Sequence, residues 1–149
     1  MIEYGFAKES DIDSLVELEN ECFIHPFSRK DLLYEINDNP VNKIIVAKDG
    51  GKIAGVIDYM ITFNSATITQ IAVTSSYRRK GIGFELLKRM EETFPKNIED
   101  MVETITLEVR KTNEPAHLLY LKAGYEDLLI KKNYYQDGED AIYMIKRLI

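Results

Sequence analysis

The stretch IAVTSSYRRKGIGFELLKRM, residues 71–90, joins an apolar segment to an amphipathic one through three cations and two glycines. Its first residues end a run of alternating positions, ATITQIAV, which is typical of a β-strand. The residues after the glycines recur at helical spacing until Pro95, where a helix cannot continue. The stretch therefore predicts a strand, a basic glycine turn and a helix whose apolar face contains Ile82, Leu86, Leu87, Met90 and Phe94.

The turn between this strand and this helix is suited to binding an anion. Amide groups that open a helix point outward without partners, and the helix dipole adds partial positive charge there. Glycine lets the backbone approach a ligand closely, and Arg78, Arg79 and Lys80 add three charges. A glycine turn beside a solvated basic patch explains the same spacing, so both interpretations stay open at this point.

Two nucleotide-binding motifs are absent from the turn. The loop of nucleotide hydrolases has two glycines five residues apart, followed by lysine and serine or threonine. Here Gly81 and Gly83 are two residues apart and are followed by Phe84 and Glu85. The dinucleotide motif has a third glycine three residues after the second, where this chain has Leu86. The turn therefore predicts neither of these nucleotide-binding classes.

Length and composition limit the possible partners. A chain of 149 residues suits a single domain, residues 1–149, and its net charge of −6 argues against a nucleic-acid partner. No apolar run approaches the roughly 18 to 20 residues of a membrane helix. Cys22, His25 and His117 do not have metal-ligand spacing, so we expect no metal. The amino terminus resembles no export signal, which favours the cytoplasm. We expect a monomer or a weak homodimer.

Patterns on either side of the stretch predict the remaining elements. Helices are expected at residues 10–23, with a Ser10–Asp13 capping box, at 25–36, with a Ser28–Asp31 box, and at 113–124, capped by Asn113. Strands are expected at 2–6, 43–61 (a hairpin around its two glycines), 102–110, 125–135 and 141–149. The predicted fold class is α/β (α+β), with a mixed, mostly antiparallel sheet of about seven strands and helices on both faces.

Glu108 and Tyr120 are candidates for acid–base chemistry. Glu108 alternates with Leu107 and Val109 along a strand, so it leaves the face that those two bury, and a carboxylate there can accept a proton from an ammonium group. Tyr120 lies on a helix and can donate a proton, because a tyrosine with an ordinary pKa of about 10 is protonated at neutral pH. A solvated strand glutamate and a packed core tyrosine remain alternative interpretations.

Several motifs resemble one enzyme family. The pattern Arg78-x-x-Gly81-x-Gly83 resembles the acetyl-CoA motif of the GNAT acetyltransferases, Arg/Gln-x-x-Gly-x-Gly/Ala. LEVRKTNEPAHLLYLKAGYE (107–126) and KKNYYQDGEDAIYM (131–144) are similar to segments of the RimI-type ribosomal-protein-alanine N-acetyltransferases, and HPFS (25–28) is a weaker match. Phe27 stands where that family usually has tryptophan, and Ser75 where proline is common.

The resemblance implies a GNAT-like domain, acetyl-CoA as co-substrate and a role for each matching residue. Glu108 would be the general base and Tyr120 the general acid. Phe27, Tyr134 and Tyr135 would line the groove for the acceptor peptide. The backbone of Ile71–Val73 would contact the pantetheine arm, and the turn would hold the pyrophosphate. The complete set of cofactor-binding residues is then Ile71, Ala72, Val73, Arg78, Arg79, Lys80, Gly81, Ile82, Gly83, Phe84 and Asn113.

The functional hypothesis is transfer of acetyl to the α-amine of a protein amino terminus, which the resemblance implies to be the alanine of ribosomal protein S18. Other acceptors, such as a small amine or a lysine side chain, and acyl-CoA binding without turnover are the alternatives. The presence of both Glu108 and Tyr120 favours an enzyme. Direct attack is expected because no activated cysteine is evident. The acidic cluster Asp137, Glu139 and Asp140 either solvates a loop or attracts a cationic amino terminus.

Overall fold

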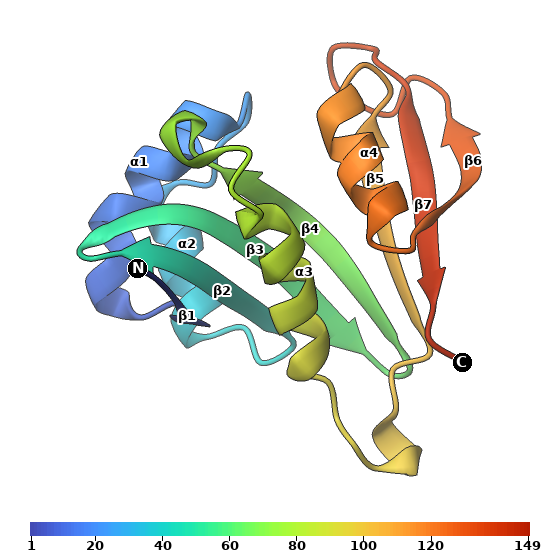
Figure 1. The fold of residues 1–149 in the computed structure, drawn as a ribbon, viewed down its shortest axis with the longest axis horizontal. Coiled ribbons are helices and arrows are strands. Elements are labelled where there is room, and N and C mark those ends of the chain that lie inside the picture. The colour runs from blue at the N-terminus through green and yellow to red at the C-terminus, as the bar shows by residue number, and fades with distance from the viewer. The chain divides into compact units, whose positions relative to one another are not determined.

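Strands and helices follow one another along the chain in the predicted order, in a computed structural model that describes residues 1–149 (Figure 1). The strands are β1 (Ile2–Phe6), β2 (Asn42–Asp49), β3 (Lys52–Thr62), β4 (Ser65–Val73), β5 (Thr104–Arg110), β6 (Glu126–Lys131) and β7 (Ala141–Arg147). The α-helices are α1 (Ile12–Cys22), α2 (Arg29–Asn37), α3 (Ile82–Glu92) and α4 (Glu114–Lys122). None of these helices is long and apolar enough to cross a membrane.

The strands form one seven-stranded sheet in the order β1-β2-β3-β4-β5-β7-β6. β4 and β5 pair in parallel, whereas the pairs β1–β2, β2–β3, β5–β7 and β6–β7 are antiparallel. The predicted mixed, mostly antiparallel sheet is therefore confirmed. The chain divides into two compact units, residues 1–60 with 70–93 and residues 61–69 with 94–149. The single domain expected over residues 1–149 stays a prediction.

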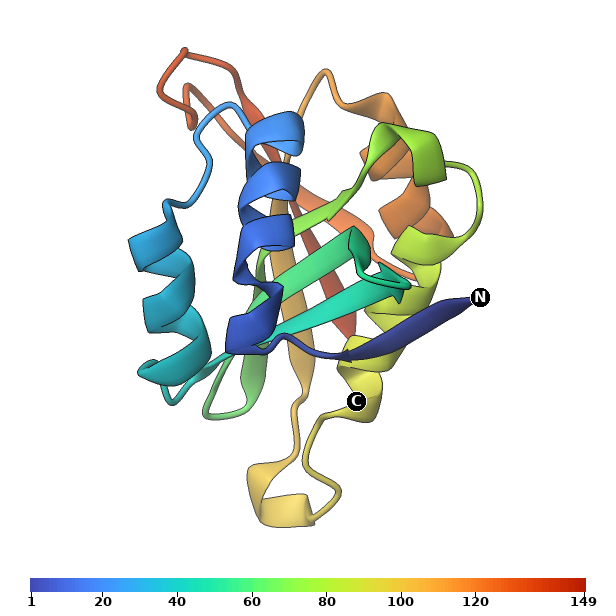
Figure 2. The ribbon, with the colours of Figure 1, turned by 90° about the vertical axis from the view of Figure 1, so that its left-hand side faces the viewer.

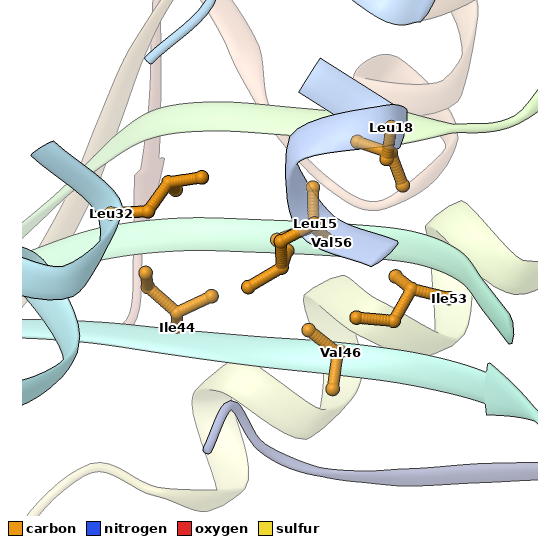
Figure 3. Close-up of a cluster of buried hydrophobic side chains, with 7 residues drawn as sticks. All are labelled: Leu15, Leu18, Leu32, Ile44, Val46, Ile53 and Val56. Atoms are coloured by element: carbon orange, nitrogen blue, oxygen red, sulfur yellow. The ribbon is translucent and has the colours of Figure 1, made fainter. Parts of the chain in front are cut away.

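In the first unit, helices cover both faces of the strands. α1 and α2 lie on one side of β2 and β3, and α3 lies on the other (Figure 2). Leucines of α1 and α2 face Ile44 and Val46 of β2, which are two residues apart, as the period of two along a strand requires. They also face Ile53 and Val56 of β3, whose spacing of three residues follows from the register shift opposite Ala47 and Lys48. Figure 3 shows this cluster, which consists of Leu15, Leu18, Leu32, Ile44, Val46, Ile53 and Val56.

Gly55 of β3 allows helix α3 to lie close to the sheet. A Cβ atom at this position would lie 3.0 Å from Cγ2 of Ile82, 3.2 Å from the carbonyl oxygen of Ala72 and 3.2 Å from Cδ1 of Leu86. Ile82 and Leu86 are both buried on the apolar face of the helix. Any side chain at position 55 would therefore push the start of α3 away from the strand.

In the second unit, β5 pairs in parallel with the first residues of β4 and antiparallel with β7. Its residues Ile105, Leu107 and Val109 are buried, and β7 pairs with it from Thr104↔Arg147 to Arg110↔Ala141. Nε2 of His117 on α4 lies 2.7 Å from Oδ1 of Asp127 on β6. His117 therefore links α4 to β6 and is half-buried.

Glu103, the residue just before β5, is held by the turn between β3 and β4 and by the residue that follows β7. The backbone N–H of Glu103 donates to the carbonyl of Asn64 at 2.7 Å, and the N–H of Leu148 donates to the carbonyl of Glu103 at 2.8 Å. Val102 is buried. These contacts therefore fix the entry into β5.

Two local predictions were wrong. The box expected at Ser10 and Asp13 does not form: Glu9–Asp11 is a 3₁₀ turn, in which the Asp11 carboxylate accepts the N–H of Lys8 at 2.8 Å and contacts Nζ of Lys48 at 2.6 Å. This contact with β2 moves the helix start to Ile12. The last strand pair is also shorter than expected, because β6 ends at Lys131 and Asn133–Tyr135 belong to the following loop. The Ser28–Asp31 box is confirmed.

We predict that Gly55→Ala destabilises the protein by about 1–3 kcal/mol, the usual cost of overpacking a tight contact. Urea unfolding measures the difference. Gly5→Ala on β1 is the matched control, because a methyl group at that position would meet no atom within 4 Å beyond its chain neighbours, and its effect should stay within about 0.5 kcal/mol. Equal losses in both variants would contradict the close-approach explanation.

Candidate active site

The end of β4 leads into the basic turn that the sequence singled out. The N–H of Thr74 donates to the carbonyl of Ala54 at 2.9 Å, which ties the end of this strand to β3. The carbonyl of Val73 accepts a hydrogen bond from Nε of Arg78 at 3.0 Å. Arg78 therefore folds back onto the strand end, and its guanidinium lies beside the last residue of the predicted pantetheine-contacting segment.

Tyr77 anchors the turn to the β2–β3 hairpin. Its hydroxyl donates to Oδ2 of Asp49 at 2.5 Å. The ammonium groups of Lys52 and Lys80 lie 5.7 Å and 5.5 Å from the centre of its ring, within the range of cation–π attraction. One aromatic side chain thus holds both the hairpin and the third cation of the turn.

The turn has the backbone geometry of an anion site at a helix start. Arg79 and Gly81 are both left-handed, with φ of 64° and 79°. Gly81 is the N-cap of α3, and no side chain caps this helix. The side chains of Arg78, Arg79 and Lys80 are exposed around it. Uncapped amide groups and exposed cations are what a pyrophosphate requires, so the residues present suit the phosphates of acetyl-CoA.

Glu108, the candidate base, lies on β5 in the second unit and is half-buried. Its Oε1 accepts a hydrogen bond from the hydroxyl of Tyr134 at 2.9 Å. Its Oε2 lies 3.8 Å from Nζ of Lys131. Burial, followed by the hydrogen bond to Glu108, raises the pKa of Tyr134 to about 12, so its phenol stays protonated and keeps donating. The carboxylate is therefore held at both oxygens.

Tyr120, the candidate acid, is the buried residue of α4. Its ring makes an edge contact with Tyr125, with 5.9 Å between ring centres. Burial, with a smaller contribution from Tyr135, raises the pKa of Tyr120 well above its ordinary range. The phenol therefore remains protonated at neutral pH, as a proton donor must. Asn113 caps the same helix, and its side-chain oxygen accepts the N–H of Ala116 at 3.3 Å.

Arg110 organises the loop between β6 and β7. Its Nη1 contacts Oδ2 of Asp137 at 2.8 Å and Oε1 of Glu139 at 2.9 Å, and its guanidinium lies 4.0 Å from the centre of the Tyr135 ring. Glu139 also accepts hydrogen bonds from the N–H and hydroxyl of Thr112. These bonds favour the structural interpretation of the acidic cluster, since its charges are used within the loop.

Asp140, the third member of the acidic cluster, is bonded to the start of the same loop. Its carboxylate accepts the N–H of Asn133 at 2.9 Å and contacts Nζ of Lys132 at 3.2 Å. The Asn133 hydrogen bond is the largest cause of a lowered pKa for Asp140. These contacts hold Asn133 in a left-handed conformation, with φ of 51°. The position of Tyr134 and Tyr135, whose rings lie 5.0 Å apart, follows from this turn.

Glu19 is a residue that the sequence analysis missed. It is 1% exposed on α1, and its Oε1 accepts the N–H of Phe27 at 2.8 Å and the side-chain amide of Gln70 at 3.2 Å. Phe27 is half-buried and packs against the leucine cluster of the first unit. Glu19 therefore holds Phe27, which is predicted to line the groove for the acceptor peptide. The one feature of the sequence that could have indicated this role is a glutamate among the apolar residues of a helix stripe.

Cys22 is close to the end of β4 but is not activated. Its Sγ lies 3.9 Å from the carbonyl oxygen of Val73. Burial is the main cause of a raised pKa for this thiol, so it carries little thiolate at neutral pH. This agrees with the expectation that no cysteine nucleophile takes part.

The structure groups the predicted site residues in two sets. The turn, the end of β4 and Phe27 belong to the first unit. Glu108, Asn113, Tyr120, Tyr134 and Tyr135 belong to the second, where Tyr134 directly contacts Glu108. No group of three or more histidine, cysteine, aspartate or glutamate side chains is arranged to hold a metal ion.

Comparison with known proteins identifies the family of this chain. The sequence model described as the acetyltransferase (GNAT) family matches residues 12–125, which include the basic turn, Glu108 and Tyr120. The chain belongs to the GNAT acetyltransferase family. The predicted enzyme class, an acyl-CoA-dependent N-acetyltransferase, is thereby confirmed.

Individual relatives of this GNAT chain match it over nearly its full length. A putative ribosomal protein bS18-alanine N-acetyltransferase of Bacillus subtilis is 36% identical over 135 residues, which are 90% of this chain and 87% of the relative. The crystal structure of the Escherichia coli ribosomal-protein-S18-alanine N-acetyltransferase superposes with a TM-score of 0.83 at 28% identity, over 99% of this chain and 94% of that one. The predicted resemblance to the RimI type is confirmed.

A more distant structure shares the fold. Arabidopsis thaliana NAA60 in complex with acetyl-CoA superposes with a TM-score of 0.87 at 16% identity, over 99% of both chains. At this identity the likeness concerns the fold alone.

We predict that Glu19→Gln gains thermal stability relative to the wild type as pH rises. Burial is the main cause that raises the pKa of Glu19 in the folded state above about 4.5. Protonated Glu19 therefore stabilises the fold below that pH, and the stability is lost as pH rises through the folded pKa. Glutamine, which cannot ionise, avoids this loss, so the difference in Tm (variant minus wild type) should increase between pH 4 and pH 7.

Thermal unfolding followed by circular dichroism at several pH values measures this difference. Glu17→Gln is the control, because Glu17 lies on the same helix with an exposed side chain. A Tm difference for Glu19→Gln that stays constant or decreases with pH would show that burial of this carboxyl is not costly.

Proposed function

We propose that this GNAT enzyme transfers acetyl from acetyl-CoA to the α-amine of a protein amino terminus, with the amino-terminal alanine of ribosomal protein S18 as the acceptor. The observation that carries the proposal is the 36% identity to the Bacillus subtilis putative bS18-alanine N-acetyltransferase over nine tenths of this chain. The 0.83 TM-score with the Escherichia coli S18-alanine enzyme supports it.

In this proposal the basic turn binds the co-substrate. The amides that open α3 and the side chains of Arg79 and Lys80 bind the pyrophosphate, and Ile71–Val73 contact the pantetheine arm. The glycine at the N-cap, Gly81, supports this assignment, because it has no side chain to cap the helix and leaves its first amides open to a ligand. Arg78, Gly83, Phe84 and Asn113 complete the proposed binding set.

The proposed chemistry is a direct attack by the acceptor amine. Glu108 takes a proton from the ammonium group, and the neutral amine attacks the thioester carbonyl, near the backbone amide of Val73. The C–S bond then breaks, and Tyr120 gives its proton to the departing sulfur. The raised pKa of Tyr120 supports this role, because the phenol is protonated before each turnover and is driven to regain its proton afterwards.

The acceptor is proposed to contact Phe27 and the tyrosines of the β6–β7 loop, Tyr134 and Tyr135. Glu19 would hold the Phe27 wall through its hydrogen bond to the backbone. Arg110 would hold the Tyr135 ring. Both aromatic walls are therefore supported by buried or paired charged groups rather than by the loops alone.

We predict that Glu108→Gln and Tyr120→Phe each lower kcat by about 10²–10³-fold, the usual effect of removing a general base or acid. Steady-state kinetics with acetyl-CoA and an alanine peptide measure the effect, and calorimetry should show unchanged acetyl-CoA binding. Glu126→Gln, an exposed carboxyl of β6, is the control and should keep full activity. Unchanged kcat in both site variants, with normal binding, would refute the assigned roles.

We also predict that an S18 amino-terminal peptide is acetylated with a kcat/KM at least about 10²-fold above that of two competitors. When another amine binds in a site built for a peptide amino terminus, polar groups of the site lose their hydrogen-bond partners. The first competitor is the same peptide with its α-amine blocked and a lysine side chain left free. The second competitor is a polyamine. Mass spectrometry of S18 from cells with and without the gene gives the second measurement. Preferred acetylation of the lysine or the polyamine would exclude this acceptor.

A further inference from the structure

Lys131 lies beside the candidate base although it is distant from it in sequence. Its Nζ is 3.8 Å from Oε2 of Glu108. The other oxygen, Oε1, is the acceptor for the hydroxyl of Tyr134 at 2.9 Å. The carboxylate is thus held between a cation and a phenol, which restricts its rotation.

The register of the sheet determines this arrangement. Glu108 of β5 is directly opposite Tyr143 of β7, and Lys131 of β6 is directly opposite Ala141, two residues away on the same strand. Side chains at directly opposed positions, and at positions two apart, share one face of a sheet. Lys131, Tyr143 and Glu108 therefore project from the same face on three adjacent strands.

The ammonium group of Lys131 is also held by two aromatic rings. It lies 4.2 Å from the centre of the Tyr143 ring and 5.2 Å from that of Tyr134. Both distances are within the roughly 6 Å range of cation–π attraction. Lys131 is only 36% exposed along its side chain and Glu108 only 19%. An isolated surface ion pair lacks such support and is usually mobile.

We propose that Lys131 is a positioning residue for the reaction, which holds the Glu108 carboxylate in the orientation that accepts the proton of the acceptor amine. The inference rests on the proposed function, in which Glu108 is the base. Tyr134 and Tyr143 contribute by holding the ammonium and, in the case of Tyr134, the second oxygen. A carboxylate fixed at both oxygens needs no reorientation during proton transfer, which is the advantage of a preorganised site.

The test is a double-mutant cycle in the intact enzyme with acetyl-CoA and the alanine peptide. Lys131→Met should lower kcat by about threefold to tenfold, within the range for two coupled groups in contact, with the KM for acetyl-CoA unchanged. Lys131→Arg should recover most of the loss, because a guanidinium also reaches a carboxylate and stacks on aromatic rings. In the Glu108→Gln background, Lys131→Met should have no further effect.

The control removes a cation from an exposed ion pair between two neighbouring strands, β7 and β6. Arg147→Met breaks the exposed contact between Arg147 of β7 and Glu126 of β6, at 3.2 Å, and should leave kcat unchanged. Melting temperatures of all variants separate a loss of folding from a loss of turnover.

The possible outcomes distinguish the two proposals. If Glu108→Gln alone leaves turnover unchanged, the proposed function fails. If Glu108→Gln is slow but Lys131→Met lowers kcat by the same factor in both backgrounds, only the role of Lys131 is refuted. A loss that arginine does not recover, or one that follows the melting temperature, would also overturn it. If residual turnover of Glu108→Gln is too slow to measure, two other results test the role of Lys131. These are the recovery of kcat in Lys131→Arg and the unchanged KM for acetyl-CoA in Lys131→Met.

Discussion

The close approach of helix α3 to strand β3 at Gly55 is the contact on which the basic turn depends. Without a side chain at position 55, Ile82 and Leu86 lie against the strand, next to the carbonyl of Ala72. This places the start of α3 directly after the end of β4. The left-handed residues Arg79 and Gly81 then connect the two without a capping side chain, so the anion-binding geometry is a consequence of packing beneath it.

In the second unit, two charged residues of β5 position the residues around them. Strand β5 presents Glu108 and Arg110 on one face while Leu107 and Val109 are buried on the other. Arg110 contacts Asp137 of the acidic loop and the Tyr135 ring. Glu108 accepts a hydrogen bond from Tyr134 and lies near the ammonium group of Lys131. Two charged residues of one strand therefore organise the loop that is proposed to bind the acceptor. The acidic side chains serve this loop and are not free charges.

Local patterns predicted the elements well and the long-range contacts poorly. The Ser28 box formed because all its groups lie within four residues. The Ser10 box failed because Asp11 binds Lys48, which is far along the chain. The strand over 125–135 was extended too far because apolar and aromatic residues continue past Lys131, whereas Asp140 bends the backbone at Asn133. Glu19 was overlooked because its partners, Phe27 and Gln70, come from a loop and another strand.

By itself the sequence determined the order of strands and helices, the basic turn before α3 and the identity of the candidate base and acid, because each depends on residues adjacent along the chain or on a motif. Only the tertiary structure decided how the side chains are held. The partners of Glu108 are 23 and 26 positions away, and those of Arg110 are 27 and 29 away. Contacts over such separations depend on strand register, which hydrophobic alternation leaves open until the sheet is assembled.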